Sequence, residues 1–126
     1  MLAPVLAQLQ EDYPQDVRIV FRHFPLLSIH DKAALSMQAS EAAGMQGKFW
    51  EMHDLLFETQ DDWKDLDLAA FESWLEEQAG EIGLDTAEFT SDLNSADNAA
   101  KAQKAWDDGV AAGFPGTPLV LINGRY

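Results

Sequence analysis

The chain has 126 residues, 47% of them hydrophobic, which is enough for one domain with its own core. Its net charge of −14, from 8 basic and 22 acidic residues, argues against nucleic acids and anionic membranes as partners, because both require clustered Lys and Arg. No apolar run approaches the roughly 20 residues that span a bilayer. The sequence contains no cysteine, so disulfides, thiolate metal sites and thiol catalysis are excluded within these residues.

The chain begins with a predicted helix and a predicted strand. Residues 2–13 are expected to form an amphipathic helix, because their apolar side chains fall on one helical face. Residues 17–24 have strand composition, with apolar side chains on one face and Arg18 and Arg22 on the other. Pro25 ends this segment.

Residues 28–112 are predicted to be almost wholly helical. Ser28, with Asp31 three residues later, resembles a capping box for a helix that runs through Ala43. Further helices are expected over residues 48–59, 67–82, 85–93 and 96–112, with Asp67 and Asp85 as N-caps. The segment between the helices expected over 48–59 and 67–82, Asp61 to Asp65, is expected to be a polar loop.

The segment Gly113–Gly124 combines a helix stop, a rigid turn, a short apolar strand and a hairpin turn. Pro118 precedes the run Leu-Val-Leu-Ile and restricts Thr117 to extended conformations. The Thr117–Pro118 bond is a candidate for a cis peptide, since only bonds before proline adopt that form at low cost. Asn123-Gly124 is a strong hairpin signal.

Several of these stretches, in this order, resemble the DsbA-like thiol–disulfide oxidoreductases of the thioredoxin superfamily. Arg22-His23-Phe24-Pro25-Leu26 resembles the exit of a family strand, Gln46-Gly-Lys-Phe-Trp50 the start of its helical insertion, and Gly113–Gly124 its cis-proline loop. The resemblance implies an α/β thioredoxin-like fold with an inserted helical subdomain, truncated at both ends. Residues 1–27 and 96–126 would form the thioredoxin-like part, and residues 28–95 the helical insertion.

The same resemblance implies a function. The parent protein would form or exchange disulfides in extracytoplasmic proteins, in the periplasm or cell envelope, through a Cys-x-x-Cys motif expected upstream of Leu2. Thr117 and Pro118, with Gly116, are implied to contact extended polypeptide substrates. No catalytic residue, metal or cofactor is expected in these residues, and the chain alone is expected to be inactive in thiol chemistry.

Two other functions fit the sequence. One is a non-catalytic thioredoxin-like module that binds peptides at Thr117 and Pro118. The other is a glutathione-dependent transferase or isomerase of the same fold, which uses Ser instead of Cys. In each case we expect no nucleic-acid binding and no membrane insertion, and we expect exposed strand edges to favour self-association into homo-oligomers.

Other residues that could carry chemistry have simpler explanations. The three histidines, His23, His30 and His53, match no metal-ligand spacing and are interpreted as packed or surface residues. The acidic clusters at 61–67 and 72–81 are interpreted as solvated surface, because the first lacks the Gly and terminal Glu of a calcium loop. The four tryptophans are interpreted as packing residues: Trp50, Trp63, Trp74 and Trp106.

Overall fold

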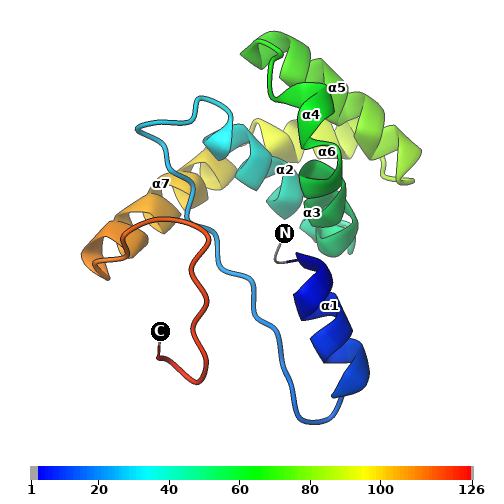
Figure 1. Cartoon of the computed structure of the whole chain (residues 1–126). Coiled ribbons are helices and arrows are strands. Elements are labelled where there is room, and N and C mark those ends of the chain that lie inside the picture. Colours follow the sequence, from blue (N-terminus) through cyan, green and yellow to red (C-terminus); the bar gives the residue numbers. More distant parts are fainter. Residues whose placement is uncertain (1–2, 126) are drawn as a thin grey trace.

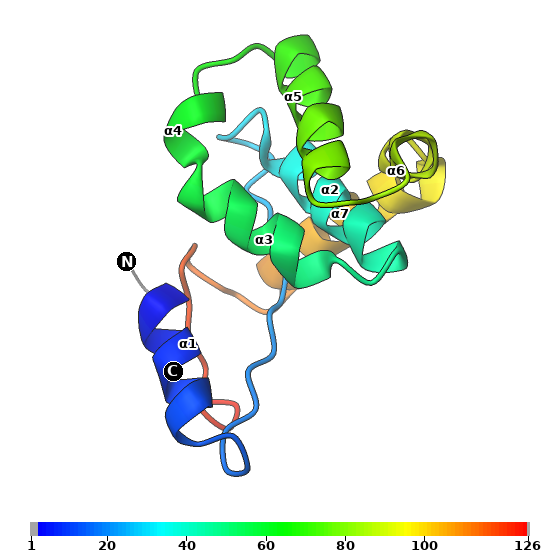
Figure 2. The ribbon, with the colours of Figure 1, turned by 90° about the vertical axis from the view of Figure 1, so that its right-hand side faces the viewer.

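The computed structural model describes residues 3–125, and these residues are mainly helical (Figure 1). The helices are α1 (Ala3–Asp12), α2 (Ala33–Met45), α3 (Phe49–Glu58), α4 (Gln60–Trp63), α5 (Leu68–Glu81), α6 (Thr86–Leu93) and α7 (Ala96–Ala111). Helix α2 packs against α3, α5, α6 and α7, whereas α1 stands apart from this group in Figures 1 and 2. Within the described residues, no helix combines the length and the apolar character that crossing a membrane requires.

Side-chain caps fix the starts of three helices. The Asp67 carboxylate accepts a hydrogen bond from the Ala70 N–H at 2.8 Å, and the Asp85 carboxylate accepts one from the Glu88 N–H at 2.9 Å. Both N-caps were predicted from the sequence, because a cap depends on residues within one turn of each other. The third side-chain N-cap is Ser95, at the start of α7, and it was not predicted from the sequence.

The predicted capping box at Ser28 is wrong. Helix α2 begins at Ala33, and its N-cap residue, Lys32, makes no side-chain capping bond. The N–H groups of Ile29 and His30 instead donate to the carbonyl oxygen of Leu26, each at 3.1 Å. This turn occupies the residues that the capping box was expected to place at the helix start.

The hydrophobic core lies between α2, α3, α5 and α6. The side of α2 that faces the core is built from small residues, and larger side chains from the other helices fill the space against it. The fully buried members are Ala39, Ala42, Ala43, Met52, Phe71, Leu75, Ala79, Phe89 and Leu93. Buried Asn98 ties α7 to this body, because its side-chain amide donates to the carbonyl oxygens of Gln38 at 2.8 Å and Asp92 at 3.2 Å.

The predicted α/β fold is wrong for the structure described. Residues 3–125 contain no strand and no sheet. The segments 17–24 and 119–121, predicted as strands, leave the helical body as extended chain (Figures 1 and 2). A strand needs a hydrogen-bonded neighbour as well as suitable composition, and among the described residues neither segment has one. The proposed division into a thioredoxin-like part and an insertion stays a prediction.

The hairpin signal at Asn123-Gly124 is confirmed as a turn. Both residues have positive φ, 51° and 79°, as a type I′ turn requires. The Ile122 N–H donates to the Arg125 carbonyl at 2.8 Å, and the Arg125 N–H donates back at 3.1 Å. The resulting antiparallel bridge is a single residue pair.

Phe24 fastens the end of the 17–24 segment to α7. Its ring stacks on Trp106, with ring centres 5.5 Å apart, and meets the edge of Phe114 at 6.4 Å. The ring also lies over Gly109, in the interior of α7, where an added Cβ would overlap it. A glycine at this position therefore lets the extended segment approach the helix backbone closely.

This contact predicts opposite effects for two glycine substitutions. Gly109→Ala is expected to lower the free energy of unfolding by about 1–3 kcal/mol, because the new methyl group displaces the Phe24 ring. Gly80→Ala in α5 is the matched control, since its Cβ would meet only Thr86 Cγ2, at an ordinary 3.5 Å. That change should leave stability equal or raise it by up to about 1 kcal/mol. Urea unfolding followed by circular dichroism measures both, and equal stabilities would contradict the packing described.

Candidate functional site

The loop Gly113–Pro118 is held to the end of α7. The Phe114 N–H donates to the Gly109 carbonyl at 3.2 Å, and the Phe114 ring packs against Phe24. Gly116 has φ of +154°, a conformation that other residues rarely adopt. The start of the loop is thus anchored, and the chain leaves it in a direction set by Gly116.

Thr117 and Pro118, the residues expected to contact substrate, are both exposed, and the peptide bond between them is cis. Val120 and Leu121 after them are 42% and 43% exposed. No backbone group from Thr117 to Leu121 takes part in a backbone hydrogen bond within residues 3–125. The segment therefore has backbone donors and acceptors that no other described backbone group satisfies.

Histidines 23 and 53, distant in sequence, meet in a cluster that the sequence analysis did not predict. His53 on α3 is 4.5 Å from the Phe21 ring and 5.2 Å from the Trp50 ring, measured between ring centres. His23 lies 5.1 Å from Phe21, on the same extended segment. In the sequence, a spacing of two residues marks one face of the extended segment 17–24, and a spacing of four residues marks one face of α3. These spacings do not show that the two faces meet.

Glu41 of α2 lies on the polar side of this cluster. Its carboxylate lies 3.3 Å from Nε2 of His23 and 3.1 Å from Nζ of Lys101. Burial lowers the pKa of His23 below its usual 6.5, because it disfavours the charged imidazolium, and the Glu41 carboxylate partly offsets this effect. His53 Nδ1 lies 2.9 Å from a carboxylate oxygen of Asp54.

The remaining candidate residues lie apart from one another. His30 is exposed on the turn before α2. Among the acidic residues near α4, Asp61 pairs with Lys64, and Asp67 serves as a helix cap. Trp63 packs in the core, where its indole N–H donates to the Leu56 carbonyl at 3.0 Å. Over residues 3–125, no three His, Asp or Glu side chains gather where a metal ion could bind.

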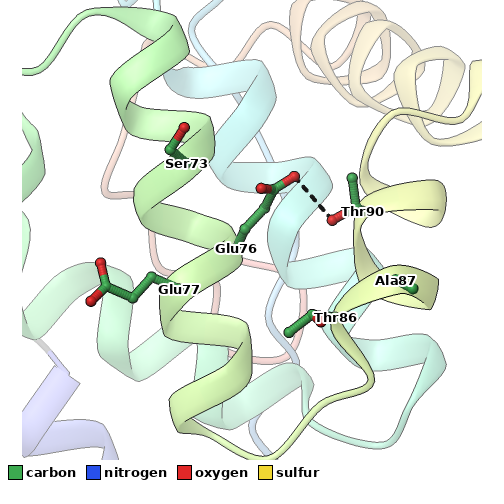
Figure 3. A pocket seen from close by; sticks show the side chains of 6 residues that line it. All are labelled: Ser73, Glu76, Glu77, Thr86, Ala87 and Thr90. Atoms are coloured by element: carbon green, nitrogen blue, oxygen red, sulfur yellow. Dashed lines mark hydrogen bonds between the residues drawn. The ribbon is translucent and has the colours of Figure 1, made fainter.

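A shallow groove lies between α5 and α6 (Figure 3). Its lining residues are Ser73, Glu76, Glu77, Thr86, Ala87 and Thr90. The Thr90 hydroxyl donates to the Glu76 carboxylate at 3.0 Å across the groove. The charged groups that line the groove are the carboxylates of Glu76 and Glu77, and the Thr90 hydroxyl is already bonded to Glu76. We therefore assign no chemistry to this groove.

The burial of His23 predicts a pH-dependent stability. The unfolded imidazole, with a pKa near 6.5, takes up a proton before the folded one does. The stabilisation is therefore complete above about pH 6.5 and is lost as the pH falls from that value through the lower pKa of the folded imidazole. His23→Gln should reduce this loss, whereas the exposed His30→Gln should leave it unchanged. Urea unfolding from pH 8 to pH 5 tests this, and identical pH profiles for wild type and His23→Gln would contradict it.

Comparison with known proteins places the chain beside parts of much longer ones. It is 36% identical over 122 residues to a protein of Salinispora tropica named Na(+)/H(+) antiporter NhaA 3, covering 97% of this chain and 18% of that protein. Similar relatives are NhaA 1 of Mycolicibacterium vanbaalenii, 33% identical over 119 residues, and NhaA of Herminiimonas arsenicoxydans, 32% identical over 117 residues. Each of these alignments covers 93% of this chain and 18% or 17% of the relative. The chain thus spans less than a fifth of the length of these relatives.

No solved structure matches the chain. A family model described as thioredoxin matches residues 3–126, which is nearly the whole sequence. The match includes the loop at Thr117–Pro118 and the extended segments on either side of the helical body. The chain therefore belongs to the thioredoxin family.

Proposed function

We propose that this chain is the polypeptide-binding part of a DsbA-like protein that exchanges thiols and disulfides in extracytoplasmic proteins. In this proposal, Gly116, Thr117 and Pro118 and the extended residues 119–121 contact the substrate. The observation behind this proposal is the largely exposed segment from Thr117 to Leu121, which makes no backbone hydrogen bond within residues 3–125. An extended substrate can pair with such a backbone whatever its side chains, as a broad-range exchange protein requires.

The chemistry of exchange assigns a limited role to this chain. A thiolate attacks one sulfur of a disulfide, forms a mixed disulfide and releases the other sulfur as a thiolate; a second thiol then resolves the mixed disulfide. The 126 residues contain no cysteine. In the proposal the thiols come from other residues of the parent protein, and this chain positions the polypeptide.

The relatives favour a second candidate, a non-catalytic thioredoxin-like module in a protein of ion transport. The observation behind it is 32–36% identity, over nearly the whole chain, to proteins named Na(+)/H(+) antiporters. In this candidate the transport belongs to the rest of the protein, and the loop at Thr117–Pro118 binds a polypeptide without changing it covalently. The two candidates share the binding loop and differ in whether thiols act on the bound chain.

Backbone pairing at the loop predicts a side-specific effect of proline. In an extended segment, consecutive N–H groups point to opposite sides, so only one of Val120 and Leu121 can donate to a given partner strand. Either Val120→Pro or Leu121→Pro should therefore weaken binding of an uncharged peptide of Val, Thr and Gln about tenfold, the equivalent of one hydrogen bond. The other variant should change binding by less than about twofold.

The measurement is a titration of the isotopically labelled chain followed by NMR. The peptide should shift the amides of residues 116–121, and Val5→Ala, an exposed change on α1, should leave the affinity unaltered. Shifts confined to other parts of the chain, or equal weakening by the two proline variants, would contradict the proposed contact.

A further inference from the structure

Two dipeptides of the sequence, Asp108-Gly109 and Asn123-Gly124, allow the same spontaneous ring closure. In each, the backbone nitrogen of the glycine can attack the side-chain carbonyl carbon of the preceding residue and form a five-membered imide. Glycine favours this reaction, because it has no Cβ to obstruct the nitrogen and it restricts the backbone least. The chain has two other asparagines, Asn94 and Asn98, and each is followed by a residue with a Cβ. These four sites differ in how firmly the structure holds them.

The Asp108-Gly109 site is restrained by helix α7. Both residues lie in the interior of the helix, so ring closure would require the backbone to leave the helical conformation and break its hydrogen bonds. Lys104 Nζ donates to the Asp108 carboxylate at 2.6 Å. The Phe24 ring lies directly over Gly109. The reaction at this site is therefore opposed by the packed structure.

The two other asparagines are held by their side-chain amides. The Asn94 amide donates to the Glu72 carboxylate at 2.7 Å. Asn98 is fully buried, and its amide donates to the Gln38 carbonyl at 2.8 Å. Ring closure at either residue would break these hydrogen bonds, and at Asn98 it would also require the core to open.

Asn123-Gly124 lacks such restraints. Both residues are exposed. Neither the Asn123 side chain nor the Gly124 N–H forms a hydrogen bond within residues 3–125. Among the described residues, the turn is closed by one residue pair, Ile122 and Arg125. Opening this turn costs much less free energy than opening a packed helix, so the Gly124 nitrogen can reach Asn123 Cγ far more often than its counterparts can at the other sites.

We propose that Asn123 is a site of spontaneous deamidation. The Gly124 nitrogen forms a bond to Asn123 Cγ, the bond from Cγ to the side-chain nitrogen breaks, and ammonia leaves with the proton of the Gly124 N–H. Water then opens the imide at one of its two carbonyl carbons. Attack at Cγ yields aspartate with the original backbone. Attack at the backbone carbonyl carbon yields isoaspartate, whose main chain passes through Cβ and Cγ. Water is the only co-reactant, and nothing is oxidised or reduced.

The isoaspartate product is incompatible with the turn. It adds one carbon atom to the main chain between Ile122 and Arg125, whereas a type I′ turn joins its two ends through two residues of normal length. The bridge between Ile122 and Arg125 is therefore lost in this product. The aspartate product keeps the backbone and adds one negative charge. This inference goes beyond the proposed function and does not depend on it.

The test is incubation of the folded chain at mildly alkaline pH, followed by proteolysis and mass spectrometry. The peptide that contains Asn123 should gain about 1 Da at least about tenfold faster than the peptides that contain Asn94 and Asn98, because opening of the turn is the least costly. A protease that cleaves before aspartate but not before isoaspartate distinguishes the two products. The same protease detects isomerisation of Asp108, which leaves the mass unchanged.

Incubation in concentrated urea separates the effect of the fold from that of the dipeptide. Unfolding should accelerate isomerisation of Asp108 at least about tenfold, because it removes the helix that opposes the reaction. Deamidation of Asn123 should change by less than about tenfold, because its turn already opens readily. Circular dichroism verifies that the chain stays folded without urea.

Two matched glycine variants test the attacking nitrogen. Gly124→Ala should slow deamidation of Asn123 at least about tenfold, because the new Cβ obstructs the nitrogen. Gly113→Ala is the control, since both glycines have positive φ, +79° and +73°, and an added Cβ would meet nothing within 4 Å at either position. The control should leave the rate at Asn123 unchanged within about twofold, because position 113 is remote from the reacting atoms.

NMR contacts between residues 122 and 125 of the isotopically labelled chain test the consequence for the turn. They should persist in the variant Asn123→Asp and disappear from the purified isoaspartate form.

Four results would overturn the proposal. They are equal rates at Asn123 and Asn94 in the folded chain, acceleration of Asn123 by urea as large as that of Asp108, equal slowing by the two glycine variants, and an intact bridge in the isoaspartate form. None of these measurements involves a bound polypeptide, so each outcome leaves the proposed function untouched.

Discussion

The structure depends on the small side chains of α2. Ala39, Ala42 and Ala43 are fully buried, and they let α3, α6 and α7 approach the same helix closely while Phe71 and Phe89 fill the space beside them. The extended segment 17–24 is in turn attached to this body through Phe24 on α7, through Phe21 beside His53 of α3 and through His23 beside Glu41 of α2. A larger residue on the inner side of α2 would separate the helices and so disturb the support on which the 17–24 segment rests.

Features decided within one turn of chain could be predicted from the sequence. Asp67 and Asp85 cap helices, and Asn123-Gly124 turns the chain, because each depends on immediate neighbours. The strands could not be predicted in this way: residues 17–24 and 119–121 have strand composition, but a strand is completed by a partner that composition does not supply. The cluster of His23 and His53 was missed for a related reason, since it joins two segments about thirty residues apart.

Family membership and the local structure support different parts of the proposed function. The thioredoxin match covers nearly the whole chain, including the loop at Thr117–Pro118, and the sequence contains no cysteine. Both extended segments have backbone groups without a backbone partner among the described residues, and the segments differ in charge. The segment after Pro118 is apolar as far as Ile122, and the 17–24 segment carries two arginines. In our account the loop at Thr117–Pro118 is the part that binds a polypeptide.

The central claim is that a packed helical body carries two extended segments whose backbone is unpaired. Native-state hydrogen exchange, resolved by residue, tests it most directly. The account predicts slow exchange at the buried turns of α2, α5 and α6, and exchange close to the rate of an unstructured peptide for the amides of residues 18–24 and 119–121. Protection of those amides comparable to that of the α2 core would show that they are hydrogen-bonded in a sheet, and would contradict the account.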